Sequence, residues 1–258
     1  MSNLFFHWSV VLRLFFYVFE KKGSCSCGEL FIQPHNIDSV VKPNDRTASI
    51  HKNQSGCAKV KNAYNGGLTR EQFLFFEIRI VAALLQQGLN REEVLTKIKE
   101  ENLFQFPTER MVASILNACL RRIEALHSEG LTYNLAYAPA EVAKQINLYA
   151  MMKYNRLVWD FMITVIAEKF RTQEFDFSKK DLNGFFFRLC EQNDSVASWS
   201  DGTICKIKQV LTKSLVECGY LDSIHAAQLN PVSIVPELED EIRANNDISA
   251  LAAFNCFR

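Results

Sequence analysis

Apolar side chains recur along most of the chain at the three- and four-residue spacing of amphipathic helices. In residues 108–127 they fall on one side of a helical projection, at Val112, Ile115, Leu116, Cys119, Ile123 and Leu126. Residues 200–218 repeat the pattern, with Ile204, Ile207, Leu211, Leu215 and Cys218 on one side. The spacing therefore predicts two long helices, each with one face in a core.

A shorter helix is expected before the first of these. Asn90 is suited to cap an amphipathic helix over 91–101, and residues 102–107 form a brief apolar turn that ends in a proline. Together with the helix over 108–127, these segments have the outline of a helix-turn-helix.

Two further helical stretches are predicted around this unit. Thr69 is the expected N-cap of a helix over 73–85, which Gly88 ends. Residues 139–171 read as helix with one weak break at Asn155. This second stretch is apolar on most sides, and the positions expected to be buried are Leu148, Met151, Met152, Leu157, Val158, Phe161, Val165 and Ile166.

The last third of the chain repeats the order of helix, turn and helix. Helices are expected over 178–191 and 200–218, each opened by a serine, with a turn over 194–199 between them. Two short strands are expected at 220–221 and 232–235. Helix, turn, recognition helix and wing are the elements of a winged helix.

The expected fold class is mainly α, with an N-terminal helix-turn-helix domain and a C-terminal winged-helix-like domain joined by a packed helical middle. A hydrophobic content of 48% with only ten Gly and six Pro favours helices over short strands. The expected divisions are a disordered or non-native extension at 1–61, the helix-turn-helix at 62–132, connecting helices at 133–175 and the winged-helix-like part at 176–258.

The N-terminal extension raises the question of a membrane anchor. Leu4 to Phe19 is nearly all apolar, but it is shorter than the ~20 residues of a span and has Arg13 in its middle. It also lacks the basic start and small-residue cleavage site of a signal peptide. A cytoplasmic protein is therefore expected.

The eight cysteines form no CxxC pair, which favours a reducing compartment. Cys25, Cys27 and Cys57 do not have the spacing of a zinc site. We expect no metal and no cofactor.

The outward faces of the two long helices are the candidate binding surfaces. With 29 Lys+Arg against 29 Asp+Glu, the chain has no net charge, so a site for a polyanion must be a local cluster. The outward rows are free of acid: Arg110, Ser114, Asn117 and Arg121 on the first helix, and Gly202, Lys206, Gln209 and Lys213 on the second. Arginine and asparagine are the side chains that reach guanine and adenine edges. The two rows indicate which residues would contact a nucleic acid; the competing interpretation is the solvated face that any amphipathic helix has.

Catalytic motifs are absent from the sequence. None of the five histidines belongs to an HExxH motif, and the chain has no GxSxG, GxxxxGK[ST] or GxGxxG motif. A non-enzymatic protein is expected.

Six phrases of the sequence resemble those of the BrxA family of BREX phage-defence systems. They are YNGGLTREQ at 64–72, ENLFQFPTER at 101–110, KQINLYAMMK at 144–153, RLVWDF at 156–161, SWSDGTI at 198–204 and AFNCF at 253–257. The resemblance runs from about residue 62 to the end of the chain, and residues 1–61 do not share it.

The resemblance implies a small helical accessory protein of bacterial BREX antiviral defence, with helix-turn-helix and winged-helix-like parts and an affinity for double-stranded DNA. It supplies no site residues. Two alternatives stay open: an adaptor that docks other BREX proteins, and an RNA-binding helical module. Exposed stacking aromatics would favour RNA, and neither polar row contains one.

Overall fold

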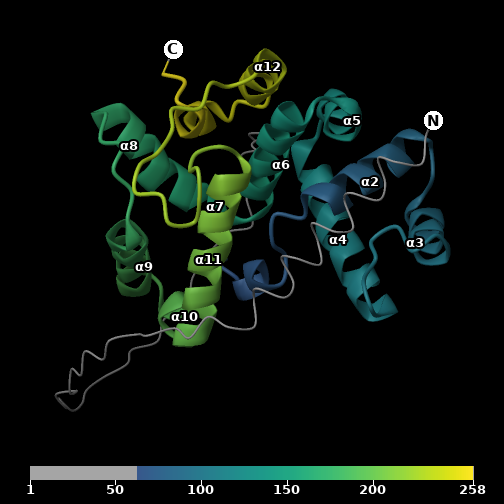
Figure 1. Ribbon diagram of the computed structural model, residues 1–258, viewed down its shortest axis with the longest axis horizontal. Helices are drawn as coiled ribbons and strands as arrows, with labels where there is room; N and C mark the ends of the chain where they lie inside the picture. The colour runs from purple at the N-terminus through teal and green to yellow at the C-terminus, as the bar shows by residue number, and fades with distance from the viewer. Residues whose placement is uncertain (1–62, 258) are drawn as a thin grey trace, which may run out of the picture. The chain divides into compact units, whose positions relative to one another are not determined.

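Helices make up nearly all the regular structure of residues 63–257, the part of the chain that the computed structural model describes (Figure 1). The α-helices are α2 (Phe75–Gln86), α3 (Arg91–Glu100), α4 (Glu109–Leu126), α5 (Glu129–Tyr137), α6 (Ala140–Tyr154), α7 (Arg156–Phe161), α8 (Ala167–Thr172), α9 (Lys179–Gln192), α10 (Asp194–Ala197), α11 (Asp201–Glu217) and α12 (Pro236–Ala244). Three further helical segments are not α-helical. Two are 3-10 helices, η1 (Gly66–Thr69) and η3 (Ile248–Phe254), and one is a π-helix, η2 (Met162–Ile166). The expected mainly helical class is confirmed. The N-terminal extension, its apolar stretch and Cys25, Cys27 and Cys57 lie outside the described residues.

Side-chain caps open both α3 and α4, and the cap of α3 is the predicted Asn90. The Asn90 side chain accepts hydrogen bonds from the backbone amides of Glu92 and Glu93, and the Glu93 carboxylate accepts one from the Asn90 amide at 2.8 Å. At α4, the Thr108 hydroxyl accepts a hydrogen bond from the Met111 amide. These caps satisfy amides that a helix start would otherwise leave unpaired, so they fix where α3 and α4 begin.

Replacing Asn90 with alanine should lower the free energy of unfolding by about 1 kcal/mol, because the variant loses both acceptor bonds of the capping box. Urea unfolding followed by circular dichroism measures the change. Asn90→Asp is the matched control, since aspartate keeps the acceptor and should keep most of the stability. Equal midpoints for Asn90→Ala and the unaltered chain would show that the capping box contributes nothing.

The start of α2 differs from the prediction. Thr69 lies in η1 rather than at an N-cap, and α2 begins only after Leu74, which has a left-handed φ of 52° and no side-chain cap. The backbone carbonyls of residues 71–73 accept hydrogen bonds from the buried side chains of Arg122 and Asn147. These long-range bonds occupy the carbonyls of the segment, and the helix starts later than its local sequence indicates.

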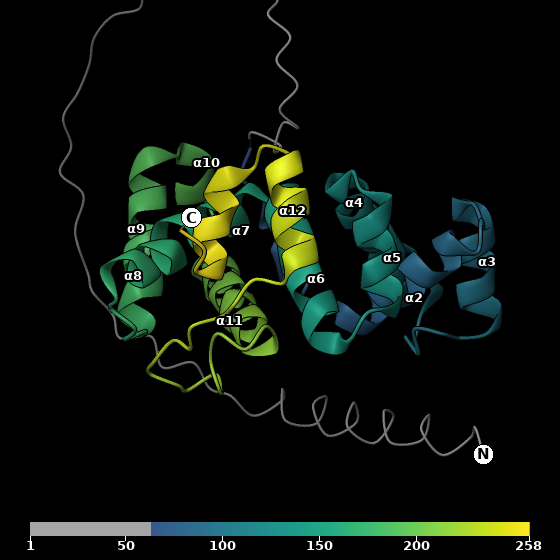
Figure 2. The same ribbon diagram turned by 90° about the horizontal axis from the view of Figure 1, so that it is seen from above.

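The middle of the chain forms the packed centre, as predicted. Asn155 ends α6, and its side chain caps α7 by accepting from the Leu157 amide. All eight apolar positions predicted to be buried in this stretch are buried. Helix α6 packs against α4 and α5 (Figure 2), although no helix was predicted at α5.

The two predicted strands after α11 are wrong, and residues 63–257 contain no wing of paired strands. Their only β-pairing is an isolated bridge between Asp176 and Gln228. The Tyr220 carbonyl accepts from the Asn230 amide at 2.8 Å, and the Val235 amide donates to Gln145 Oε1 at 3.0 Å. Because these backbone groups are satisfied by a loop and a side chain, no strand partner is needed. Pro236 then opens α12, a helix that was not predicted from the sequence.

The described residues 63–257 belong to one compact unit. Its buried apolar side chains make one cluster that extends from Leu68 in η1 to Phe254 in η3. The division of the chain at residues 62–132, 133–175 and 176–258 stays a prediction. Within residues 63–257, no helix combines the length and apolarity needed to cross a bilayer.

Candidate nucleic-acid interface

Helix α4 presents its polar row to solvent, as its periodicity predicts. All six apolar positions predicted to face inward are buried. Arg110, Ser114 and Arg121 are exposed, and Asn117 is half-buried. At 1.5 Å per residue, Arg110 and Arg121 lie about 16 Å apart along one face of the helix. The row is therefore an accessible line of hydrogen-bond donors.

Arg91, the first residue of α3, joins this row and was not predicted to belong to it. Its Nη2 donates to Asn117 Oδ1 at 2.6 Å. The bond occupies the Asn117 oxygen and leaves the cation of Arg91 on the same surface, where it is exposed. Helical periodicity cannot reveal a contact between residues 26 positions apart, so the sequence reading missed it.

At both ends of the α4 row, a charged side chain is paired with a side chain of a neighbouring helix. Arg121 Nη1 donates to the Tyr154 hydroxyl at 3.2 Å, and this hydrogen bond raises the pKa of Arg121. At the other end, Lys99 Nζ lies 2.8 Å from the Glu109 carboxylate and lowers its pKa. The acid next to Arg110 is thus paired with a cation from α3, which limits its repulsion of an anionic ligand.

The α11 row is less open than predicted. Ile207, Leu211, Leu215 and Cys218 are buried as expected, while Ile204 is half-buried. Gly202 and Gln209 are exposed, but Lys206 and Lys213 are half-buried. Helix α11 packs on η1, and a Cβ added at Gly66 would meet Thr203 Cγ2 at 3.5 Å.

A neighbouring cation of α11 has a structural role. Lys208 Nζ donates to Asn183 Oδ1 at 2.8 Å and lies 5.3 Å from the centre of the Phe186 ring. Both partners are on α9, so this contact ties α9 to α11. The segment 194–199 between these two helices, predicted as a turn, contains the short helix α10.

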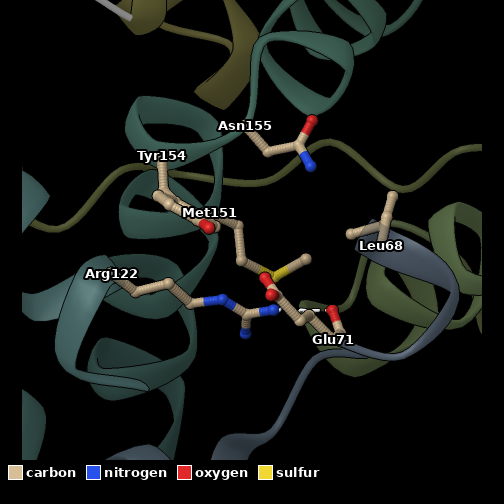
Figure 3. A pocket seen from close by; sticks show the side chains of 6 residues that line it. All are labelled: Leu68, Glu71, Arg122, Met151, Tyr154 and Asn155. Atoms are coloured by element: carbon tan, nitrogen blue, oxygen red, sulfur yellow. Dashed lines mark hydrogen bonds between the residues drawn. The ribbon is translucent and has the colours of Figure 1, made fainter. Parts of the chain in front are cut away.

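A small hollow lies beside Tyr154, the hydrogen-bond partner of Arg121, between α4, α6 and the segment that leads into α2 (Figure 3). Its lining residues are Leu68, Glu71, Arg122, Met151, Tyr154 and Asn155. The guanidinium of Arg122 points into it from α4 and donates to the Glu71 backbone carbonyl. The hollow is thus filled largely by the protein's own contacts.

We next considered the side chains of residues 63–257 that could bind a metal ion or act as nucleophiles. Residues 63–257 hold no group of three or more His, Cys, Asp or Glu side chains placed to bind a metal ion. Burial raises the pKa of Cys119 to about 12 and also raises that of Cys218. These two thiols are buried and protonated, as expected of cysteines that pack as small apolar side chains.

Comparison with known proteins identifies relatives over most of the chain. The model of the BrxA family matches residues 62–246. A protein of Bacillus cereus named BREX protein BrxA is 36% identical over 161 residues, which are 62% of this chain and 80% of that protein. BREX protein BrxA of Escherichia coli is 24% identical over 190 residues, covering 73% of this chain and 89% of that one.

A solved structure shares the fold. The crystal structure of an uncharacterised protein from Magnetospirillum magneticum superposes with a TM-score of 0.64 and 23% identity. The match covers 74% of this chain and 97% of the other. At this identity the likeness concerns the arrangement of helices alone.

Proposed function

Because the chain belongs to the BrxA family, we propose that it serves BREX phage defence as a non-enzymatic protein that binds double-stranded DNA in the cytoplasm. The observation that carries the proposal is the surface formed by Arg91, Arg110, Ser114, Asn117 and Arg121 on α3 and α4. It is a line of donors on a rigid helix, with its neighbouring acid paired to Lys99.

Helices α3 and α4 act in this proposal as a helix-turn-helix, with α4 as the helix that meets the duplex. The Arg91 to Asn117 hydrogen bond and the Lys99 to Glu109 ion pair fix α3 across α4 at two points. A recognition helix needs such support, because side chains read DNA only when the helix that carries them is held in place.

Helices α9, α10 and α11 supply the second element, in which Lys206, Gln209 and Lys213 add contacts. Residues 219–235, which follow α11 where a winged helix has its strands, form irregular structure. We assign most of the affinity to phosphate contacts by arginine and lysine, with little sequence selectivity, because few base-reading side chains are present.

RNA is the weaker candidate partner. RNA recognition relies on aromatic side chains that stack on unpaired bases. The exposed aromatics of α2 and α5, Phe76, Tyr133 and Tyr137, lie on other helices than the two polar rows. No aromatic side chain stands among the row residues on α4 and α11.

Those same aromatics favour the second candidate function, an adaptor that docks other BREX proteins. Phe76 is 56% exposed, and Tyr133 and Tyr137 are 55% and 51% exposed with ring centroids 5.0 Å apart. Tyrosine and phenylalanine are enriched in protein interfaces. Substituting Phe76, Tyr133 and Tyr137 with serine would abolish binding of a purified BREX partner if the adaptor function holds, and would leave duplex binding intact.

A mobility-shift series tests the proposed function. It compares duplex DNA, single-stranded DNA and RNA of one sequence at two salt concentrations. We expect the duplex to bind most tightly and its affinity to fall with salt. Stronger binding of RNA, or no binding of any nucleic acid at the lower salt, contradicts the proposal.

A further inference from the structure

The segment Tyr64–Leu74, here called the strap, connects the helices that carry the two polar rows. At its start, the Tyr64 hydroxyl donates to Asp160 Oδ2 of α7 at 2.5 Å, and the Arg156 guanidinium lies 4.5 Å from the centre of the Tyr64 ring. Its η1 turn packs on α11. Its last part lies against α4 and α6, so the strap contacts four helices.

Arg122 of α4 holds the last part of the strap. Its Nη2 donates to the backbone carbonyls of Glu71 and Gln72 at 2.6 and 2.7 Å, and its Nη1 donates to that of Phe73 at 3.0 Å (Figure 3 shows the bond to Glu71). Asn147 Nδ2 also donates to the Phe73 carbonyl, at 2.7 Å. The Arg122 side chain is 1% exposed. Burial of a cation is costly, and the carbonyls it satisfies would otherwise be unpaired in the core.

The strap is under backbone strain where these bonds end. Leu74 follows Phe73 with φ 52° and ψ 40°, a left-handed conformation that leucine rarely adopts. Such a conformation persists only where the surroundings enforce it. The bonds to residues 71–73 supply that constraint, and they therefore set the path of the strap from η1 into α2.

Arginine suits this position better than lysine. Its planar guanidinium carries five N–H donors in a fixed fork, so one side chain can reach three successive carbonyls. A lysine ammonium keeps the charge but concentrates its donors at one point. Arg122→Lys therefore removes the geometry of the link while it conserves the charge.

We propose that Arg122 is a positioning residue which, through the strap, holds α11 in a fixed place relative to α4, so that both polar rows can engage one duplex. The adjacent residue on α4, Arg121, faces solvent in the first row, while Arg122 faces the strap. Binding of one row then brings the other to the DNA at high effective concentration. The part of this inference that concerns DNA rests on the proposed function.

Hydrogen exchange measures the link without DNA. The amides of Arg70 and Glu71 donate to the Gly67 carbonyl inside the strap, at 2.9 and 3.1 Å. In Arg122→Lys we expect these amides and those of the first turn of α11 to exchange at least about tenfold faster, while the core of α2 and α6 stays protected. Asn147→Ala, which removes one bond to Phe73, should show a smaller effect of the same pattern and serves if Arg122→Lys does not fold.

Duplex binding measures the consequence for the two rows. Arg122→Lys should weaken binding about tenfold through lost effective concentration. Lys206→Ala with Lys213→Ala should weaken binding strongly in the unaltered chain and by less than about twofold in Arg122→Lys, because the second row no longer binds together with the first. Ile242→Ala is the control for general destabilisation, since Ile242 is a fully buried residue of α12.

Unchanged strap exchange in Arg122→Lys and in Asn147→Ala overturns the inference. So does an equal change in Ile242→Ala at the same loss of thermal stability, because the effect is then general. If the strap loosens but the unaltered chain binds no duplex, the proposed function fails while the strap's role in holding α11 stands. If duplex binding occurs and Lys206→Ala with Lys213→Ala weakens it equally in the unaltered chain and in Arg122→Lys, the joint engagement through the strap is refuted.

Discussion

Replacing Asp247 with alanine should lower the free energy of unfolding by about 3–5 kcal/mol, the largest effect on stability that we expect of one polar substitution. Asp247 Oδ2 lies 2.8 Å from Lys153 Nζ and accepts a hydrogen bond from the Tyr149 hydroxyl at 2.6 Å. The side chains of Lys153 and Asp247 are only 5% and 10% exposed. The variant leaves the lysine cation buried without its partner. Urea unfolding measures the loss.

Two further variants identify the cause. Lys153→Met combined with Asp247→Leu should recover most of the stability, because an apolar pair leaves no buried charge. Arg243→Ala, which breaks the more exposed ion pair with Glu239, should cost less than about 1 kcal/mol. A loss below 1 kcal/mol for Asp247→Ala would mean that water reaches Lys153 and that the pair does not anchor η3 to α6.

The sequence predicts those elements whose signals are local. Asn90, Thr108, Ser178 and Ser200 cap helices through bonds to amides two or three residues away. Such bonds depend only on neighbouring residues, so α3, α4, α9 and α11 begin within a residue or two of their predicted starts. The inward face of α4 was also predictable, because periodicity fixes which side chains share a face.

The elements that were missed or misplaced depend on distant residues. The start of α2 is delayed by Arg122 and Asn147, 49 and 74 positions from Phe73. In the segment 232–235, which was predicted as a strand, the Val235 amide instead donates to Gln145 Oε1, 90 positions away in the sequence. No window of local sequence contains these partners, which is why propensity and turn residues gave the wrong element.

For the candidate site too, the sequence predicts what depends on one helix and misses what depends on contacts between elements. Arg110, Ser114 and Arg121 are exposed because they lie opposite the buried face of their own helix. Lys206 and Lys213 are half-buried, which the periodicity of α11 alone does not predict. Arg91 belongs to the surface through a contact across two helices.

Replacing Arg110 and Arg121 together with alanine should produce the largest loss of DNA binding. Both side chains are exposed, so the buried Ile115, Leu116 and Ile123 keep their packing and stability should barely change. Each lost base-reading contact should cost about 1–3 kcal/mol, and each lost phosphate contact should reduce the salt slope by about 1. Fluorescence anisotropy with a labelled duplex at several salt concentrations measures both.

Arg171 and Arg188 provide the matched control, because both are exposed arginines that lie off the two rows, on α8 and α9. Alanine at these two positions removes the same charge and should leave affinity and salt slope nearly unchanged. Equal losses for the two double variants would show that DNA responds to the overall charge of the protein. Unchanged affinity after substitution of Arg110, Arg121, Lys206 and Lys213 would place any DNA site elsewhere.

The measurement that tests the central claim most directly is the equilibrium affinity of the unaltered chain for a duplex of random sequence, from about 50 to about 200 mM salt. If Arg91, Arg110, Arg121, Lys206 and Lys213 all contact phosphates, the logarithm of the binding constant should fall with the logarithm of salt concentration at a slope of roughly −4.5. The same slope should hold for duplexes of different sequence, since phosphate contacts do not read bases. A duplex that does not bind at the lowest salt, or one whose affinity does not change with salt, would contradict the account.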